Sequence, residues 1–100
     1  MVNMHSINLI ASSPQVRSGR PYIVGTSVTV ADVAIAMIYH RQDPDGIADW
    51  YSLSLPQVYA ALAYYYDHKS DIDEQVQSQI RKARELKEQR VGNKGSLLAL

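Results

Sequence analysis

The segment over residues 30 to about 41 constrains the fold most, because residues 33–39 are almost all apolar. A helix that is apolar nearly all round is enclosed by neighbouring elements instead of lying on a surface. Thr29 precedes the segment as a candidate N-cap, and Asp32 stands at N3, near the positive end of the helix dipole. A chain of 100 residues suffices for one modest core. We therefore predict a single domain built around this helix.

Two further helix start signals follow in the sequence. Asp43 and Pro44 form an N-cap and N1 pair, which predicts a short helix to about Tyr51. Ser54 and Gln57 form a capping box, which predicts a longer helix to about residue 68. Apolar residues spaced by three and four predict its inward stripe: Leu55, Val58, Leu62 and Tyr65. The face expected to point outward carries Gln57, Ala60, Ala61, Tyr64 and His68.

The C-terminal part of the chain predicts an amphipathic helix followed by a tail. Ser70 and Asp71 offer a cap. A narrow apolar seam with helical spacing follows, made of Ile72, Val76, Ile80, Ala83 and Leu86. Acidic residues gather in the first turn and basic residues in the second half, which suits the helix dipole. Because residues 92–96 indicate a flexible breaker, we divide the chain into a domain over 1–70, a helix over 71–91 and a flexible tail over 92–100.

The N-terminal part contains short β-prone runs. Residues 22–24 and 27–30 are rich in aromatic and β-branched side chains, and Gly25 between them can adopt a positive φ at no steric cost. This pattern predicts a hairpin or a sharp β-bend. Residues 7–11 are expected to form a short first strand that pairs with it. The predicted fold is mainly α, with a small N-terminal β-hairpin, a helix-turn-helix bundle and a C-terminal amphipathic helix.

Composition and spacing argue against most kinds of chemical site. The absence of cysteine removes disulfides, thiolate nucleophiles and cysteine-based zinc sites. The three histidines fall in different predicted elements, and helix capping explains the aspartates around Asp43. The sequence contains neither a nucleophile elbow nor a phosphate-binding loop. We therefore expect no enzyme activity, no catalytic residue, no metal and no cofactor.

Charge and hydropathy predict a cytoplasmic protein without a membrane partner. The first residues lack the pattern of a secretion signal, and no stretch approaches the roughly 20 apolar residues that a membrane span needs. Ten basic and ten acidic residues cancel, so any nucleic-acid binding must come from local patches.

The short helix, the turn over residues 52–54 and the capped helix have the layout of a helix-turn-helix. The second helix of such a pair can enter the major groove of DNA, where a glutamine can contact an adenine edge. The predicted DNA contacts are Gln57, Tyr64, His68, Lys69, Arg41 and Arg20. Small helical domains without DNA binding share this layout, however. In addition, the first seventy residues contain four basic and five acidic residues, so few positive charges are available to contact DNA phosphates. A homodimer would double the number of these basic residues.

A second hypothesis is a protein-interaction or dimerisation module that binds no DNA. Ala60, Ala61 and Ala63 beside three consecutive tyrosines would allow a close helix–helix contact with tyrosine anchors. The apolar seam and tail near the C-terminus also predict a protein partner. Its expected contacts are Ile72, Val76, Ile80, Leu86, Leu97 and Leu98. Packing within the chain would account for the seam equally well, but it gives no account of the tail.

Several residues together resemble a known prokaryotic family. They are Gly19, Arg20, Pro21, Ile23, Gly25, Thr26, Val28 and Val30, followed by Tyr51, Leu53, Val58, Ala61, Leu62, Tyr64 and Tyr65. In this pattern the chain resembles domain-of-unknown-function family four-three-three over roughly residues 7–68. The resemblance implies a helix-turn-helix-like domain of homeodomain or winged-helix type, grouped with VapB-like antitoxins. It also implies a PIN-like ribonuclease toxin as partner and repression of the chain's own operon.

The chain departs from the family pattern at three places. Ser27 stands where the family usually has arginine, and Ser52 where it often has proline. No glycine ends the first long helix. The missing arginine puts a basic role for position 27 in doubt.

Overall fold

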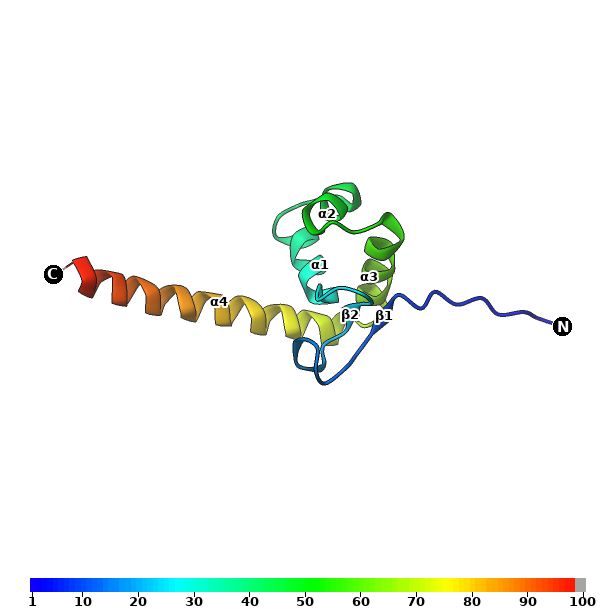
Figure 1. Cartoon of the computed structure of the whole chain (residues 1–100), viewed down its shortest axis with the longest axis horizontal. Coiled ribbons are helices and arrows are strands. Elements are labelled where there is room, and N and C mark those ends of the chain that lie inside the picture. The colour runs from blue at the N-terminus through cyan, green and yellow to red at the C-terminus, as the bar shows by residue number, and fades with distance from the viewer. Residues whose placement is uncertain (99–100) are drawn as a thin grey trace.

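The computed structural model describes the backbone of residues 1–98 and the side chains of residues 1–89. Its elements are β1 (Ile10–Ala11), the 3-10 turn η1 (Arg17–Gly19), β2 (Tyr22–Ile23), α1 (Val30–Ile38), α2 (Pro44–Tyr51), α3 (Leu55–Asp67) and α4 (Lys69–Leu98). Figure 1 shows α1, α2 and α3 gathered with the strands, while α4 runs away from this group, opposite the extended N-terminal residues. We call residues 10–80 the head and residues 81–98 the arm. The fold is mainly helical with a small antiparallel hairpin, as the sequence predicts.

The strands pair differently from the prediction: β2 pairs with β1, and residues 27–30 contribute only an isolated bridge from Thr29 to Tyr22 after the expected bend at Gly25. β1 and β2 are antiparallel, with Ile10 opposite Ile23. Only the last two residues of the predicted first strand pair in this way. The turn after β2 closes through a hydrogen bond from Thr26 N to Ile23 O (3.0 Å), and Gly25 adopts a φ of 83°. Glycine is favoured there because a Cβ atom clashes with the backbone in the left-handed region.

Helix α1 is the central helix that its composition predicts. The Thr29 hydroxyl accepts a hydrogen bond from Asp32 N (3.0 Å), and Asp32 Oδ2 accepts one from Thr29 N (3.0 Å). This capping box is worth about 1 kcal/mol. Residues 30–34 are buried, and α1 packs against α2, α3 and α4. The helix ends at Ile38, about three residues earlier than predicted.

Helices α2 and α3 begin at the predicted caps, but the faces of α3 differ from the prediction. The Asp43 carboxylate accepts from Gly46 N (2.8 Å), and Ser54 and Gln57 exchange the two bonds of a capping box. Ala61, predicted to point outward, is fully buried, whereas Leu55, predicted inward, is exposed. Because α1 and α3 pack closely together, a side chain as small as that of Ala61 fits on the buried side of α3.

Helix α4 begins earlier and ends later than predicted. Only His68, with φ −126° and ψ 41°, separates α3 from α4, so the predicted cap at Ser70 and Asp71 is wrong. The helix continues to Leu98, through the glycine-containing stretch that the sequence suggested as a breaker. The predicted tail therefore begins inside a helix, and its last two residues lie outside the described part of the chain.

The beginning of α4 completes the core of the head. Ile72 and Val76 are buried with the apolar residues of α1 and α3, and Ile80 packs at the edge of this cluster. Burying an aliphatic side chain contributes about 1.5–3 kcal/mol, so this part of α4 is a structural component of the head. In the described residues, no helix is long and apolar enough to cross a membrane.

Candidate functional site

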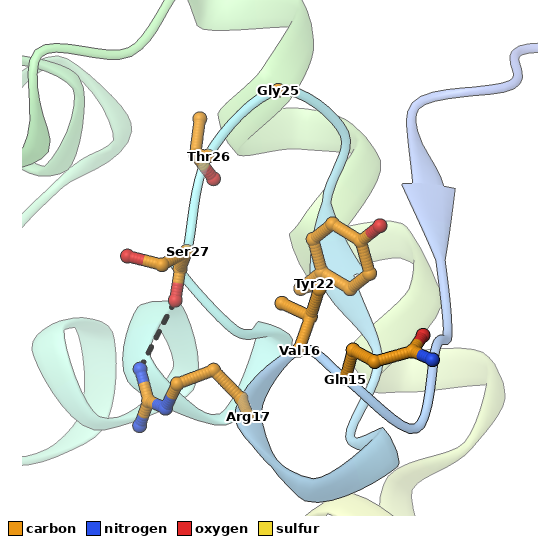
Figure 2. A pocket seen from close by; sticks show the side chains of 7 residues that line it. All are labelled: Gln15, Val16, Arg17, Tyr22, Gly25, Thr26 and Ser27. Atoms are coloured by element: carbon orange, nitrogen blue, oxygen red, sulfur yellow. Dashed lines mark hydrogen bonds between the residues drawn. The ribbon is translucent and has the colours of Figure 1, made fainter.

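The segment that carries the family resemblance lines an open hollow of about 610 Å³ at the surface of the head. Figure 2 shows its walls: Gln15, Val16 and Arg17 come from the loop before β2, and Tyr22, Gly25, Thr26 and Ser27 come from β2 and the turn after it. The guanidinium group of Arg17 donates to the backbone oxygen of Ser27 across 3.1 Å. This bond ties the two walls together.

Asp32 is the centre of a charged network beneath this hollow. Its Oδ2 accepts from Arg17 Nη1 (2.8 Å), in addition to its capping bond with Thr29 N. Its Oδ1 accepts from Gln79 Nε2 of α4 (2.8 Å). Gln79 in turn accepts from Arg20 Nη1 (3.3 Å). The network therefore joins the loop before β2, the start of α1 and the anchored part of α4.

The network also controls the ionisation of Asp32. Burial by itself raises the pKa of this carboxyl group. The hydrogen bonds from Arg17, Gln79 and Thr29 together outweigh burial, so the pKa of Asp32 lies below its ordinary value of 3.8. Asp32 is therefore a buried carboxylate with its charge compensated, and it acts as a structural link.

An unusual backbone brings Arg17 to Asp32. Arg17, Ser18 and Gly19 adopt φ values of 47°, 60° and 81°. Non-glycine residues in this region cost roughly 1–2 kcal/mol each, which the hydrogen bonds of the Arg17 side chain offset. The sequence predicts Asp32 only as a capping residue, and the pair with Arg17 was not predicted. The pairing depends on tertiary contacts, and the sequence gives no signal for left-handed geometry at Arg17 and Ser18.

Four of the six predicted DNA contacts use their side chains within the chain. Gln57 Oε1 accepts from Ser54 N (2.8 Å) in the capping box. Lys69 Nζ donates to Asp73 Oδ2 (2.9 Å), and this carboxylate also accepts from the Tyr65 hydroxyl (2.8 Å). The third is Arg20, which donates to Gln79 as described above. The fourth is His68, whose Nδ1 lies 3.2 Å from the backbone oxygen of Tyr64.

Tyr64 and His68 stack on each other, with ring centroids 4.0 Å apart, at the end of α3. Arg41 is exposed in the connection between α1 and α2, where its φ is 53°. The structure therefore spreads the six residues over several elements.

The exposed side of α3 is apolar and aromatic. Its members recur at helical spacing and are Leu55, Tyr59, Ala63 and Tyr66, which we call the α3 stripe. Tyr59 and Tyr66 are 57% and 62% exposed. At one end of the stripe, the Tyr66 hydroxyl donates to the sulfur of Met37 (3.8 Å). The α3 stripe resembles the tyrosine-anchored contact surface that the sequence suggested. The small exposed residue at its centre is Ala63, whereas Ala61 is buried.

The predicted partner contacts on α4 divide into two groups. Ile72 and Val76 are buried in the core of the head, so the prediction that they contact a partner is wrong. Ile80 is partly buried at the edge of the core, and Leu86 in the arm is 59% exposed. The side chains of Leu97 and Leu98 lie outside the described residues, so the prediction there is not tested.

Charge is divided between the head and the arm. Residues 10–80 contain four basic and eight acidic residues, a formal charge of −4. Residues 81–100 contain six basic and two acidic residues, a formal charge of +4. The neutral total therefore conceals an acidic head joined to a basic helical segment. No group of three or more metal-ligating side chains lies close together in the described residues.

The profile of one protein family matches residues 10–65 of the chain, more than half of its length. The family is described as "Protein of unknown function (DUF433)". The chain belongs to the DUF433 family. The matched DUF433 region begins at β1 and ends within α3, so it contains the hollow and most of the α3 stripe. Among curated proteins and among solved structures, no match to the chain was found.

Proposed function

We propose that this DUF433 protein is an antitoxin-type binding protein whose arm attaches to a partner protein. The family resemblance implies a PIN-like ribonuclease as that partner. In this proposal the head anchors the arm and the arm makes the inhibitory contact. The chain itself has no catalytic role.

The observation that carries the proposal is the uncovered arm. After Ile80, α4 leaves the core of the head and continues as a single helix (Figure 1). A helix without packing partners gains little stability in water, because packing supplies most helical stability in proteins. The exposed Leu86 lies on the same side of α4 as the core residues Ile72 and Val76. A partner that covers this side would stabilise the helix and bury Leu86.

The charge of the arm indicates the chemistry of the partner surface. Lys82 and Lys87 flank the apolar side of the arm, and both are exposed. Opposite charges across an interface accelerate association and fix its orientation. We therefore expect the arm to bind an acidic, partly apolar groove.

DNA binding by a helix-turn-helix is the second candidate function. The succession of α2, a three-residue turn and a capped α3 favours it. The charges favour it less, because α3 contains no lysine or arginine and α2 carries exposed Asp45 and Asp49. Phosphate contacts would have to come from other elements or from the arm. Measuring binding to the upstream DNA across a salt series tests this role, and no binding even at low salt would remove it.

The test of partner binding uses the full chain and a PIN-like ribonuclease encoded beside it. Titration calorimetry and ribonuclease activity are measured for the wild type, for Leu86→Ala and for Glu85→Ala. Glu85 is exposed and lies about 100° around the helix from Leu86, off the apolar side, and it serves as the matched control. We expect Leu86→Ala to weaken binding and inhibition about tenfold, the effect of about 1.4 kcal/mol, and Glu85→Ala to leave both nearly unchanged. Absence of binding by the wild type would refute the proposal.

A further inference from the structure

Among the described side chains, two uncovered apolar surfaces on helices lie in opposite electrostatic surroundings. One is the α3 stripe on the acidic head, and the other is the side of the basic arm that carries Ala83 and Leu86. Contiguous exposed apolar surface is a sign of an interaction site. Each surface therefore requires an explanation of what covers it.

The arm cannot cover the stripe of its own head. Helix α4 is continuous from Lys69 to Leu98, and its first turns pack against α1 and α3. The arm consequently extends away from the head, as Figure 1 shows. Contact between an arm and a stripe needs a second molecule.

We propose that two copies of the chain exchange arms, so that the arm of each copy lies along the α3 stripe of the other. The two contacts are identical and related by a two-fold axis, which closes the assembly as a dimer. The inference goes beyond the proposed function, because it concerns what covers the arm in the absence of a ribonuclease.

The dimensions and side chains of the two surfaces are compatible. At 1.5 Å per residue, the 13 residues of α3 extend about 20 Å, and an arm of residues 81–98 extends about 27 Å. Ala63 lies in the middle of the stripe, where a small side chain allows close approach of a second helix. Tyr59 and Tyr66 lie on either side of it, and tyrosine is common in the centre of protein interfaces.

The charges indicate that the α3 stripe binds the arm of a second copy and not the head of that copy. Two heads of formal charge −4 repel each other, whereas the segment that contains the arm carries +4. Lys82 and Lys87 flank the apolar side of the arm, and Asp67 at the end of α3 has a side chain that is 81% exposed. Pairing of an arm with a head therefore places opposite charges around an apolar centre.

Sedimentation of the full chain over a range of concentrations tests the inference. We expect a dimer for the wild type and a monomer for both Tyr66→Arg and Leu86→Asp. Both positions are exposed, and circular dichroism checks that each variant keeps its helices. An equimolar mixture of the two variants retains one intact contact, between the arm of Tyr66→Arg and the head of Leu86→Asp. The mixture is therefore expected to form a weaker dimer that neither variant forms alone.

Other outcomes would overturn arm exchange. A monomeric wild type would exclude it directly. A dimer that survives Leu86→Asp but not Tyr66→Arg would indicate contact between two α3 stripes, and the opposite pattern would indicate contact between two arms. The dissociation constant of the dimer should rise at least tenfold when salt is raised from low to high concentration, because salt screens the paired charges. A wild type that dimerises but leaves the ribonuclease unbound would refute the proposed function alone.

Discussion

Gln79 in α4 donates a hydrogen bond to Asp32 in the first turn of α1, with 2.8 Å between Nε2 and Oδ1. The same carboxylate caps α1 and pairs with Arg17. One acidic side chain thus joins the start of the central helix to the helix that carries the arm. The orientation of the arm relative to the head depends on this contact and on the burial of Ile72 and Val76.

Replacing Asp32 tests the importance of this link. We expect Asp32→Asn to lower the free energy of unfolding by about 2 kcal/mol, because bonds to a charged group are lost and Arg17 loses its ion-pair partner. Urea denaturation measures the change. Asp49→Asn is the control, since Asp49 is exposed on α2, and its effect should stay within about 0.5 kcal/mol. Equal losses in the two variants would contradict a special role for Asp32.

The ionisation of Asp32 predicts an acid-sensitive fold. Because its pKa is lower in the folded chain, the unfolded chain binds more protons as the pH falls. The stabilisation by Asp32 is complete above the unfolded-state pKa of about 3.9 and is lost as the pH falls through the folded-state value. The free energy of unfolding, measured from pH 6 to pH 2.5, should therefore fall more steeply for the wild type than for Asp32→Asn. Parallel curves would show that other groups cause the acid sensitivity.

The turn after β2 should tolerate only residues that accept left-handed geometry. Gly25 has a φ of 83°, and no atom lies within 4 Å of the place where a Cβ would stand. Its replacement is therefore expected to act through the backbone alone. We expect Gly25→Ala to lower the free energy of unfolding by about 1 kcal/mol, and Gly25→Asn to lower it by less, because asparagine populates this region more readily. Thermal and urea unfolding compare the two variants, and an equal or larger effect of asparagine would contradict the explanation.

The two neighbouring alanines of α3 should respond oppositely to a large charged residue. Ala61 is buried against the core and Ala63 is exposed. Ala61→Arg is expected to prevent folding, because it places an unpaired charge in the core. Ala63→Arg should keep the fold, with its helical circular dichroism and cooperative unfolding. Loss of folding in both variants would mean that the exposed side of α3 is also needed for the fold.

Local signals in the sequence predicted the starts of α1, α2 and α3 well, but not the start of α4. Thr29, Asp43 and Ser54 each cap the helix expected, because a capping bond involves residues only three positions apart. The bend at Gly25 was predicted for the same reason. Periodicity was less reliable in α3, since alanine fits either the buried or the exposed side of a helix. It therefore placed Ala61 and Leu55 on the wrong faces.

The candidate site was less predictable than the helices. The apolar seam of α4 was predicted, but the sequence does not show at which residue of α4 the head ends. Burial of Ile72 and Val76 depends on α1 and α3, which are distant in sequence. Similarly, the sequence predicted Lys69 as a DNA contact, but its ammonium group pairs with Asp73 within the chain.

The sequence by itself determined the mainly helical class, the starts of α1, α2 and α3, the β-bend and the family resemblance, because each depends on residues close together in the chain. Only the tertiary structure decided that Asp32 bonds to both Arg17 and Gln79, that Ala61 is buried while Ala63 is exposed, and that the apolar seam of α4 becomes uncovered after Ile80. The physical reason is that burial and ion pairing depend on which segments pack together. The resemblance identified by Gly19 to Val30 thus describes the head, whereas the surfaces proposed for binding were defined by how α3 and α4 pack.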